Sequence, residues 1–169
     1  MRRAAILAVL LVAAAAAMAQ GTQDFASKFM EQCLEDTAVH CITISPKMME
    51  QLTKQPDAAR NEHMAQAIQK LKSARIVTAS VRAGDYYDAA MELLRDNPQR
   101  FRHTQDYRNS HARGTFYIRQ TSSGDTVELV MLHTDTAADR LVIVNLTGDI
   151  DKEFVESLRK TFSGHGPKA

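Results

Sequence analysis

Apolar and polar positions follow the clearest pattern in the C-terminal third of the chain. Residues 115–121 and 126–134 are rich in β-branched and aromatic side chains, and the turn at 122–125 (Ser-Ser-Gly-Asp) separates them. This composition predicts two paired strands. Residues 140–147 are apolar at successive positions instead of alternate ones. We therefore expect this strand to be central in its sheet or covered on both faces.

A closing helix is predicted over residues 151–162. The Asp151 side chain can accept hydrogen bonds from the free amides of the first turn. Ile150, just before this cap, can pack against Val155 in a hydrophobic staple. The apolar face of the helix continues at helical spacing through Phe154, Leu158 and Phe162.

The first half of the chain predicts helices that alternate with strands. Ser45 and Pro46 indicate a helix start, because serine caps the first amides and proline suits the first helical position. Asp85 and Asp88 resemble a capping box with a shorter acid and indicate another start. The remaining predicted helices cover 24–34 and 57–71, and the predicted strands cover 39–45, 75–81 and 101–107, of which the last alternates like an edge strand.

These elements predict an α+β fold. Their order is helix, strand, two helices, strand, helix, then four strands and a helix. We expect a single domain with a mostly antiparallel sheet, whose last four strands form a meander, covered by helices and closed by the C-terminal helix. The length of 169 residues suits one domain with a sizeable core.

The N-terminal residues 1–19 are typical of a cleaved signal peptide. Arg2 and Arg3 precede an apolar run, and the Ala17-Met18-Ala19 segment fits a cleavage site. We therefore expect export to the periplasm or medium, a domain over 20–163 and a flexible tail over 164–169. The run is shorter than a spanning helix, so no transmembrane anchor is expected after cleavage. No cysteine lies near the predicted cleavage site, so we expect no lipid anchor.

Net charge excludes a global attraction to nucleic acid. The formal charge is +1, and cleavage of the segment that carries Arg2 and Arg3 changes it to −1. Five arginines nevertheless gather in the predicted edge region, and four of them form a candidate partner-binding face. An edge guarded by charge against strand addition explains the same pattern. The four residues are Arg100, Arg102, Arg108 and Arg113, with Arg95 just before them.

Two cysteines, Cys33 and Cys41, leave two interpretations open. A helix that turns back on the next strand can bring them within disulfide distance. They could equally be separately packed thiols. The Cys-x-x-Cys pattern of redox enzymes is missing from the sequence.

Motifs of established chemistry are not found in the sequence. It has no Gly-x-Ser-x-Gly turn, no metal-ligand spacing and no phosphate loop, so we assign no catalytic, metal or cofactor-binding residue and expect no cofactor. His103, His111 and His133 all fall in the strand-rich half, where a hairpin could bring two of them together. With a nearby carboxylate they would form the only candidate for a non-standard hydrolytic site.

One segment resembles a known family. Leu146-Thr147-Gly148-Asp149-Ile150-Asp151, which leads into the last helix, resembles the exported bacterial domain of unknown function numbered 4252. The segment Ile44-Ser45-Pro46-Lys47-Met48-Met49 and the pair Phe25 and Phe29 are also similar. The resemblance implies an exported envelope protein of Gram-negative type with no established activity, and it supplies no catalytic residue. The two cysteines are not part of this pattern, so a disulfide would be particular to this chain.

Two function hypotheses follow. The first is a non-enzymatic envelope module that binds a protein or a small ligand, with a role in envelope stress signalling as one form of it. The alternative is a small exported hydrolase that uses a histidine and a carboxylate. A histidine in a pocket beside an acid with a shifted pKa would favour the hydrolase.

Overall fold

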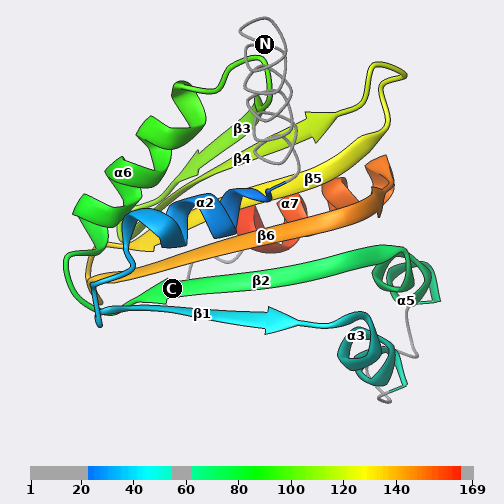
Figure 1. Cartoon of the computed structure of the whole chain (residues 1–169), viewed down its shortest axis with the longest axis horizontal. Coiled ribbons are helices and arrows are strands. Elements are labelled where there is room, and N and C mark those ends of the chain that lie inside the picture. The colour runs from blue at the N-terminus through cyan, green and yellow to red at the C-terminus, as the bar shows by residue number, and fades with distance from the viewer. Residues whose placement is uncertain (1–22, 55–61, 165–169) are drawn as a thin grey trace, which may run out of the picture.

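The computed structural model describes residues 23–54 and 62–164, and their strands form one open sheet (Figure 1). The strand order is β1-β2-β6-β5-β4-β3, and every neighbouring pair is antiparallel. The strands are β1 (Val39–Ile44), β2 (Leu71–Ala79), β3 (Arg102–Arg108), β4 (Ala112–Gln120), β5 (Thr126–Asp135) and β6 (Arg140–Ile150). The predicted α+β fold, with its C-terminal four-strand meander, is confirmed.

Helices cover both faces of the sheet. The helices are α2 (Phe25–Gln32), α3 (Pro46–Thr53), α5 (Glu62–Gln69), α6 (Ala83–Arg95) and α7 (Lys152–Gly164). One hydrophobic cluster joins α2 and α6 to the sheet, and a second joins α3, α5 and α7 to it. Figure 1 shows α2 crossing the front of the sheet and α7 behind it. We call these two sides the α6 face and the α7 face.

β6 is central, as its apolar pattern predicts. It lies between β2 and β5. Leu141 and Ile143 are fully buried on the α6 face, and Leu146 and Ile150 are buried on the α7 face. The β3 strand lies at one edge of the sheet, as its alternation predicts.

Two predicted helix caps, at Ser45 and Asp151, are present. Asp24, which was not predicted as a cap, also accepts a hydrogen bond from the Ser27 amide at 2.8 Å. Ser45 caps α3, with Pro46 at its first position, and Asp151 accepts from the Phe154 amide at 2.8 Å. Ile150 and Val155 belong to one hydrophobic cluster, as the staple predicts.

Two element boundaries differ from the prediction. The predicted helix over 57–71 is wrong at its end, because α5 stops at Gln69 and Leu71 begins β2. Leu71 is buried and pairs with Gly148 in the sheet. Its spacing from the preceding apolar residues also suits a helix, which explains the wrong boundary. The start of that predicted helix lies outside the described residues. The predicted signal peptide (1–19) and the tail after Gly164 also lie outside them.

The capping box predicted at Asp85 and Asp88 is not the cap of α6. The helix begins at Ala83, and its N-cap residue Arg82 has a left-handed backbone with no side-chain cap of its own. Asp139, in the β5–β6 turn, accepts from the Arg82 amide at 3.0 Å and from the Ala83 amide at 2.8 Å. The cap therefore comes from more than fifty residues along the chain.

Among the described residues, no helix has the length and apolar character needed to cross a membrane.

Candidate functional site

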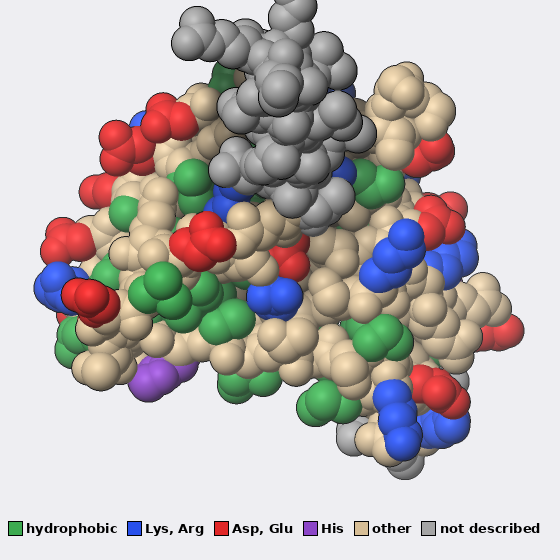
Figure 2. All heavy atoms as spheres, in the orientation of Figure 1, with side chains coloured by type: hydrophobic (Ala, Val, Ile, Leu, Met, Phe, Trp, Pro, Cys, Tyr) green, Lys and Arg blue, Asp and Glu red, His purple; other side chains and the backbone are tan. Residues whose placement is uncertain are grey.

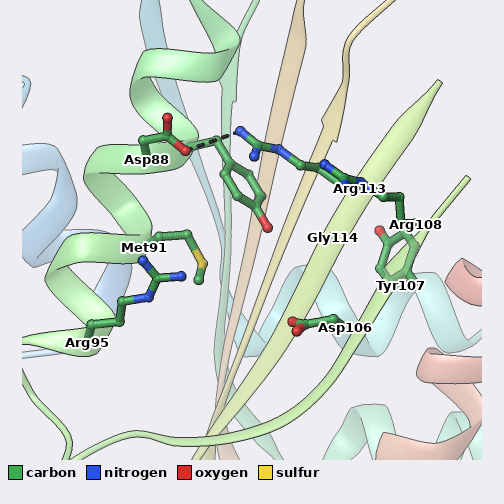
Figure 3. A pocket seen from close by; sticks show the side chains of 9 residues that line it. Asp88, Met91, Arg95, Asp106, Tyr107, Arg108, Arg113 and Gly114 are labelled. Atoms are coloured by element: carbon green, nitrogen blue, oxygen red, sulfur yellow. Dashed lines mark hydrogen bonds and ion pairs between the residues drawn. The ribbon is translucent and has the colours of Figure 1, made fainter. Parts of the chain in front are cut away.

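A groove of about 360 Å³ lies on the α6 face, between α6 and the paired ends of β3 and β4. Figure 3 shows the α6 residues on one side and the strand residues on the other. The groove is thus assembled from two parts of the chain that the sheet brings together. Its charged lining consists of Asp88, Arg95, Asp106, Arg108 and Arg113, and its other lining residues are Tyr87, Met91, Tyr107 and Gly114.

Arg113 spans the groove in a fixed position. Its guanidinium lies 3.1 Å from the Asp88 carboxylate and 4.3 Å from the centre of the Tyr87 ring (Figure 3). A guanidinium over an aromatic face gains a cation–π attraction in addition to the ion pair. Burial raises the pKa of the Tyr87 hydroxyl, so this ring stays neutral. These contacts hold Arg113 in place.

Arg108 lies beside Arg113 at one end of the groove. The two residues are directly opposite each other in the β3–β4 register. Within the described part of the chain, Arg108 forms no ion pair, whereas Arg113 is paired with Asp88. Asp88 neutralises Arg113 alone of these two neighbouring arginines, which leaves an excess of positive charge at this end. The arrangement is suited to an anionic group.

Asp106 supplies the other acid of the groove. The nearby Thr115 hydroxyl and the His103 ring, whose Nε2 lies 2.9 Å from Asp106 Oδ1, hold the pKa of Asp106 below its usual range. The carboxylate therefore stays ionised at neutral pH. It balances part of the positive charge and is a poor proton donor.

The four arginines of the predicted partner-binding face do not share one surface. Arg108 and Arg113 meet on the α6 face. Arg102 lies opposite Ile118 and lines a separate groove beside α7. A register shift between His103 and Gln105 adds one residue to β3, which turns Arg102 to the other face.

Arg100 is directed inward. Its side chain is 15% exposed and lies 3.5 Å from the buried Glu128 carboxylate. It also donates to the Gln23 carbonyl. Arg100 therefore belongs to an internal network and is not on the surface.

Glu128, on β5, is the centre of this network and is fully buried. Oε1 accepts from the Phe25 amide at 2.7 Å and from Asn145 Nδ2 at 3.0 Å. Oε2 lies 2.8 Å from Arg119 Nε, in addition to the longer contact with Arg100. A buried carboxylate is stable when it is paired and hydrogen-bonded in this way.

Asn145, on β6, completes the attachment of α2. Its Oδ1 accepts from the Ala26 amide at 2.9 Å, next to the amide bound by Glu128. Two strand side chains thus hold the first two amides of α2 against the sheet. Neither Glu128 nor Asn145 is among the functional residues predicted from the sequence. The signal that could have revealed them is a single polar residue inside each of two apolar strands.

The three candidate histidines have separate surroundings. Burial lowers the pKa of His133, whose Nδ1 lies 2.6 Å from the Tyr107 hydroxyl, and burial raises the pKa of Tyr107 to about 12. His103 pairs with Asp106, which lines the groove. His111 is in the β3–β4 turn, where its carbonyl accepts from the Thr136 amide. Across residues 23–54 and 62–164, no group of three His, Cys, Asp or Glu side chains could hold a metal ion.

Both cysteines are free thiols that pack against the same hydrophobic cluster. Burial raises the pKa of Cys33 and of Cys41, which disfavours the reactive thiolate. The disulfide stays a prediction. Comparing the intact mass of the purified mature protein after thiol alkylation with and without reductant tests it.

The segment that carries the family resemblance has a structural role. Gly148 has a φ of +144°, and a Cβ there would lie 2.6 Å from the Lys70 carbonyl oxygen. Thr147 bonds Ser73 through their hydroxyls at 2.8 Å, and Asp149 donates its amide to Lys70. Asp151 then caps α7. These residues join β6 to β2 and start the last helix, which accounts for them without any catalytic role.

Comparisons with known proteins identify a family and no activity. No curated protein matches the chain. Among solved structures, a protein of unknown function from Pseudomonas aeruginosa, PA94, is 11% identical over 80% of this chain and 86% of its own, with a TM-score of 0.37. The Ran-binding protein Mog1p of Saccharomyces cerevisiae is 14% identical over 53% of this chain and 56% of its own, with a TM-score of 0.27.

At these TM-scores neither likeness bears on the function of the chain. The family model described as "Domain of unknown function (DUF4252)" matches residues 29–158, which include both halves of the groove and the Gly148 segment. The predicted resemblance is confirmed, and this chain belongs to the DUF4252 family.

Proposed function

We propose that this chain is an exported, non-enzymatic binding module that takes an acidic segment of an envelope protein into the groove beside α6. One observation carries the proposal: Arg108 and Arg113 face each other at one end of the groove, and Arg108 forms no ion pair among the described residues. Arginine binds carboxylates through two parallel hydrogen bonds, which makes such a pair selective for acidic side chains.

The surroundings of the two arginines support this ligand class. Arg113 is already held over Tyr87 and beside Asp88, so little side-chain freedom is lost when a ligand binds. Tyr87 and Met91 supply buried apolar surface next to the charges. A volume of about 360 Å³ suits one or two side chains of an extended segment better than a large cofactor.

Export is the second part of the proposal, and residues 1–19 motivate it. Their basic start, apolar run and small-residue end are the features of a cleaved leader. N-terminal sequencing of the protein recovered from the periplasmic fraction of an expressing Gram-negative cell tests it. A chain that begins near Gln20 is expected. A chain that keeps residues 1–19 and stays in the cytosolic fraction contradicts export and leaves the groove proposal untouched.

Binding is tested by fluorescence anisotropy with the mature chain and a labelled acidic peptide of eight to ten mixed Glu, Asp and Gly residues. Saturable binding that weakens with added salt is expected. Arg108→Glu should weaken it by at least about tenfold, because it replaces an attraction with a repulsion. Arg102→Glu is the matched control, since it changes charge equally on the α7 face.

Two outcomes contradict the groove as the site. In one, the peptide does not bind to the wild-type protein at low salt. In the other, Arg102→Glu weakens binding as much as Arg108→Glu, which would indicate general attraction between charges. Capture of envelope proteins on both variants then identifies the natural ligand, because a true partner is lost with Arg108→Glu alone.

Hydrolysis is the second candidate function, and the contact of His103 with Asp106, a lining residue of the groove, favours it. A carboxylate that orients a histidine is one part of a hydrolytic site, although no serine, threonine or cysteine donates to His103 among the described residues. An ester and peptide substrate panel tests this function. Turnover that disappears in His103→Ala supports a hydrolase, and the same turnover in both proteins excludes this site.

A further inference from the structure

Exposed hydrophobic side chains gather around β1. Among the described residues, the large hydrophobic side chains with high exposure are Leu34 (78%), Ile42 (59%), Val81 (49%), Met48 (48%) and Leu52 (44%). Ile42 is on β1, Leu34 precedes this strand, and Met48 and Leu52 are on α3, which follows it. Val81 comes two residues after Ala79, which pairs with the first residue of β1. We call these five residues the β1 surface.

The β1 strand is also an uncharged sheet edge. It pairs with β2 on one side and ends the strand order on the other. Its sequence, VHCITI, has no Lys, Arg, Asp, Glu or Pro. Figure 2 shows hydrophobic side chains and a histidine, without Lys, Arg, Asp or Glu, along the lower margin of the molecule over β1. An unguarded edge of this kind has free backbone groups that can pair with another strand.

We infer that β1 is a dimerisation edge, where a second copy of this chain pairs its own β1 antiparallel across a two-fold axis. The sheet then continues from one copy into the next. In the register that centres the axis at Ile42, Ile42 of each copy lies opposite Ile42 of the other, and Cys41 lies opposite Thr43. This pairing satisfies the free edge by the same backbone hydrogen bonds that form the rest of the sheet.

The β1 surface is complementary to itself under this operation. An antiparallel pairing brings the start of one strand to the end of the other. The start of the strand in one copy, near Leu34 and Val81, then lies towards the end of the strand in the other, near Met48 and Leu52. The exposed Ile42 side chains of the two copies meet at the centre.

Charges at the two ends of β1 fit the same arrangement. Glu35 is exposed before the strand and Lys47 is exposed after it. Antiparallel pairing brings the acid of one copy towards the base of the other, and this happens twice in the dimer. The second copy is thereby favoured over an arbitrary extended segment, which would cover the edge and leave the flanks exposed.

The β3 edge is charged, in contrast to β1. Arg102, Asp106 and Arg108 lie on this strand of 7 residues. Charged side chains on an edge strand oppose the addition of another strand. Dimerisation is therefore assigned to the β1 edge, and the groove beside α6 stays open at the other side of the sheet.

Sedimentation equilibrium of the mature protein between about 1 and 200 µM tests the inference. A reversible monomer–dimer equilibrium is expected for the wild type. Ile42→Lys places two like charges at the two-fold axis and should raise the dissociation constant by at least about tenfold. Gln99→Lys adds the same charge at an exposed position after α6 and should leave the equilibrium unchanged.

Leu34→Lys is the second variant, because Leu34 lies outside any strand and helix and its change spares the sheet. It should also weaken the dimer, by less than Ile42→Lys. Circular dichroism confirms that each variant is folded. A wild type that is monomeric at every concentration overturns the inference. A dimer that persists unchanged in folded Ile42→Lys and Leu34→Lys also overturns it, since another surface would then hold the copies together.

Discussion

The α2 and α6 helices begin in the same way and in opposite environments. Each has its first amides bound by a carboxylate that is distant in sequence, Glu128 for α2 and Asp139 for α6. Glu128 is fully buried, whereas Asp139 is exposed in a turn. Each carboxylate meets the positive end of a helix dipole. Both contacts are hydrogen bonds from backbone amides to a carboxylate, so the two sites differ only in their exposure to solvent.

This difference determines how many partners each carboxylate needs. Glu128 has lost its water and is surrounded by one amide, Asn145 and two arginines. Asp139 accepts hydrogen bonds from two amides, and its remaining acceptor positions face solvent. A buried charge costs several kcal/mol if one partner is removed, whereas an exposed cap costs about 1 kcal/mol. Burial thus makes the first attachment stronger and less tolerant of change.

Glu128→Ala should produce the largest loss. It leaves Arg100 and Arg119 without their carboxylate and frees the Phe25 amide. We expect the free energy of unfolding to fall by about 3–5 kcal/mol in urea denaturation. Glu92→Ala, at an exposed position on α6, is the control and should change it by less than about 0.5 kcal/mol. Similar losses in both variants would contradict the assigned role of the buried carboxylate.

Asn145→Ala should cost less, about 1–3 kcal/mol, because it removes hydrogen bonds to Ala26 and Glu128 but leaves the ion pairs of Glu128 in place. Asn145→Asp sharpens the comparison. It keeps the acceptor for the Ala26 amide and places a second carboxylate beside Glu128, so its loss should exceed that of Asn145→Ala. Thermal unfolding followed by circular dichroism measures both. An aspartate variant as stable as wild type would show that solvent reaches this network.

Asp139→Ala should have the smallest effect, about 1–2 kcal/mol. Part of that loss comes from the backbone, since Asp139 has a φ of +45°, which alanine disfavours. Asp139→Asn keeps an oxygen that accepts from the two amides, and asparagine also tolerates a positive φ. Its free energy of unfolding should stay within about 0.5 kcal/mol of the wild-type value. Asp139→Gly removes the backbone strain but does not restore the cap, so its free energy of unfolding should lie between those of Asp139→Ala and Asp139→Asn. Urea denaturation of the three variants separates the two contributions.

The candidate site could be predicted in part. The arginine-rich segment indicated the region of the groove, and Arg108 and Arg113 do line it. The sequence could not reveal that α6 forms the opposite wall, because that depends on how the helix packs across the sheet. It also could not separate Arg102 from Arg108, because their even spacing implies one face and a single-residue bulge in β3 reverses it.

The sequence by itself determined the element order, the burial of β6 on both faces and the local caps at Ser45 and Asp151. These features depend on periodicity and on contacts within a few residues. Tertiary structure alone decided that Glu128 and Asn145 hold α2, that Asp139 caps α6, and that β2 begins at Leu71. In each case a polar or backbone group is satisfied by a partner that is distant along the chain. Local sequence carries no record of such a partner, because folding selects it through the burial that the whole sheet creates.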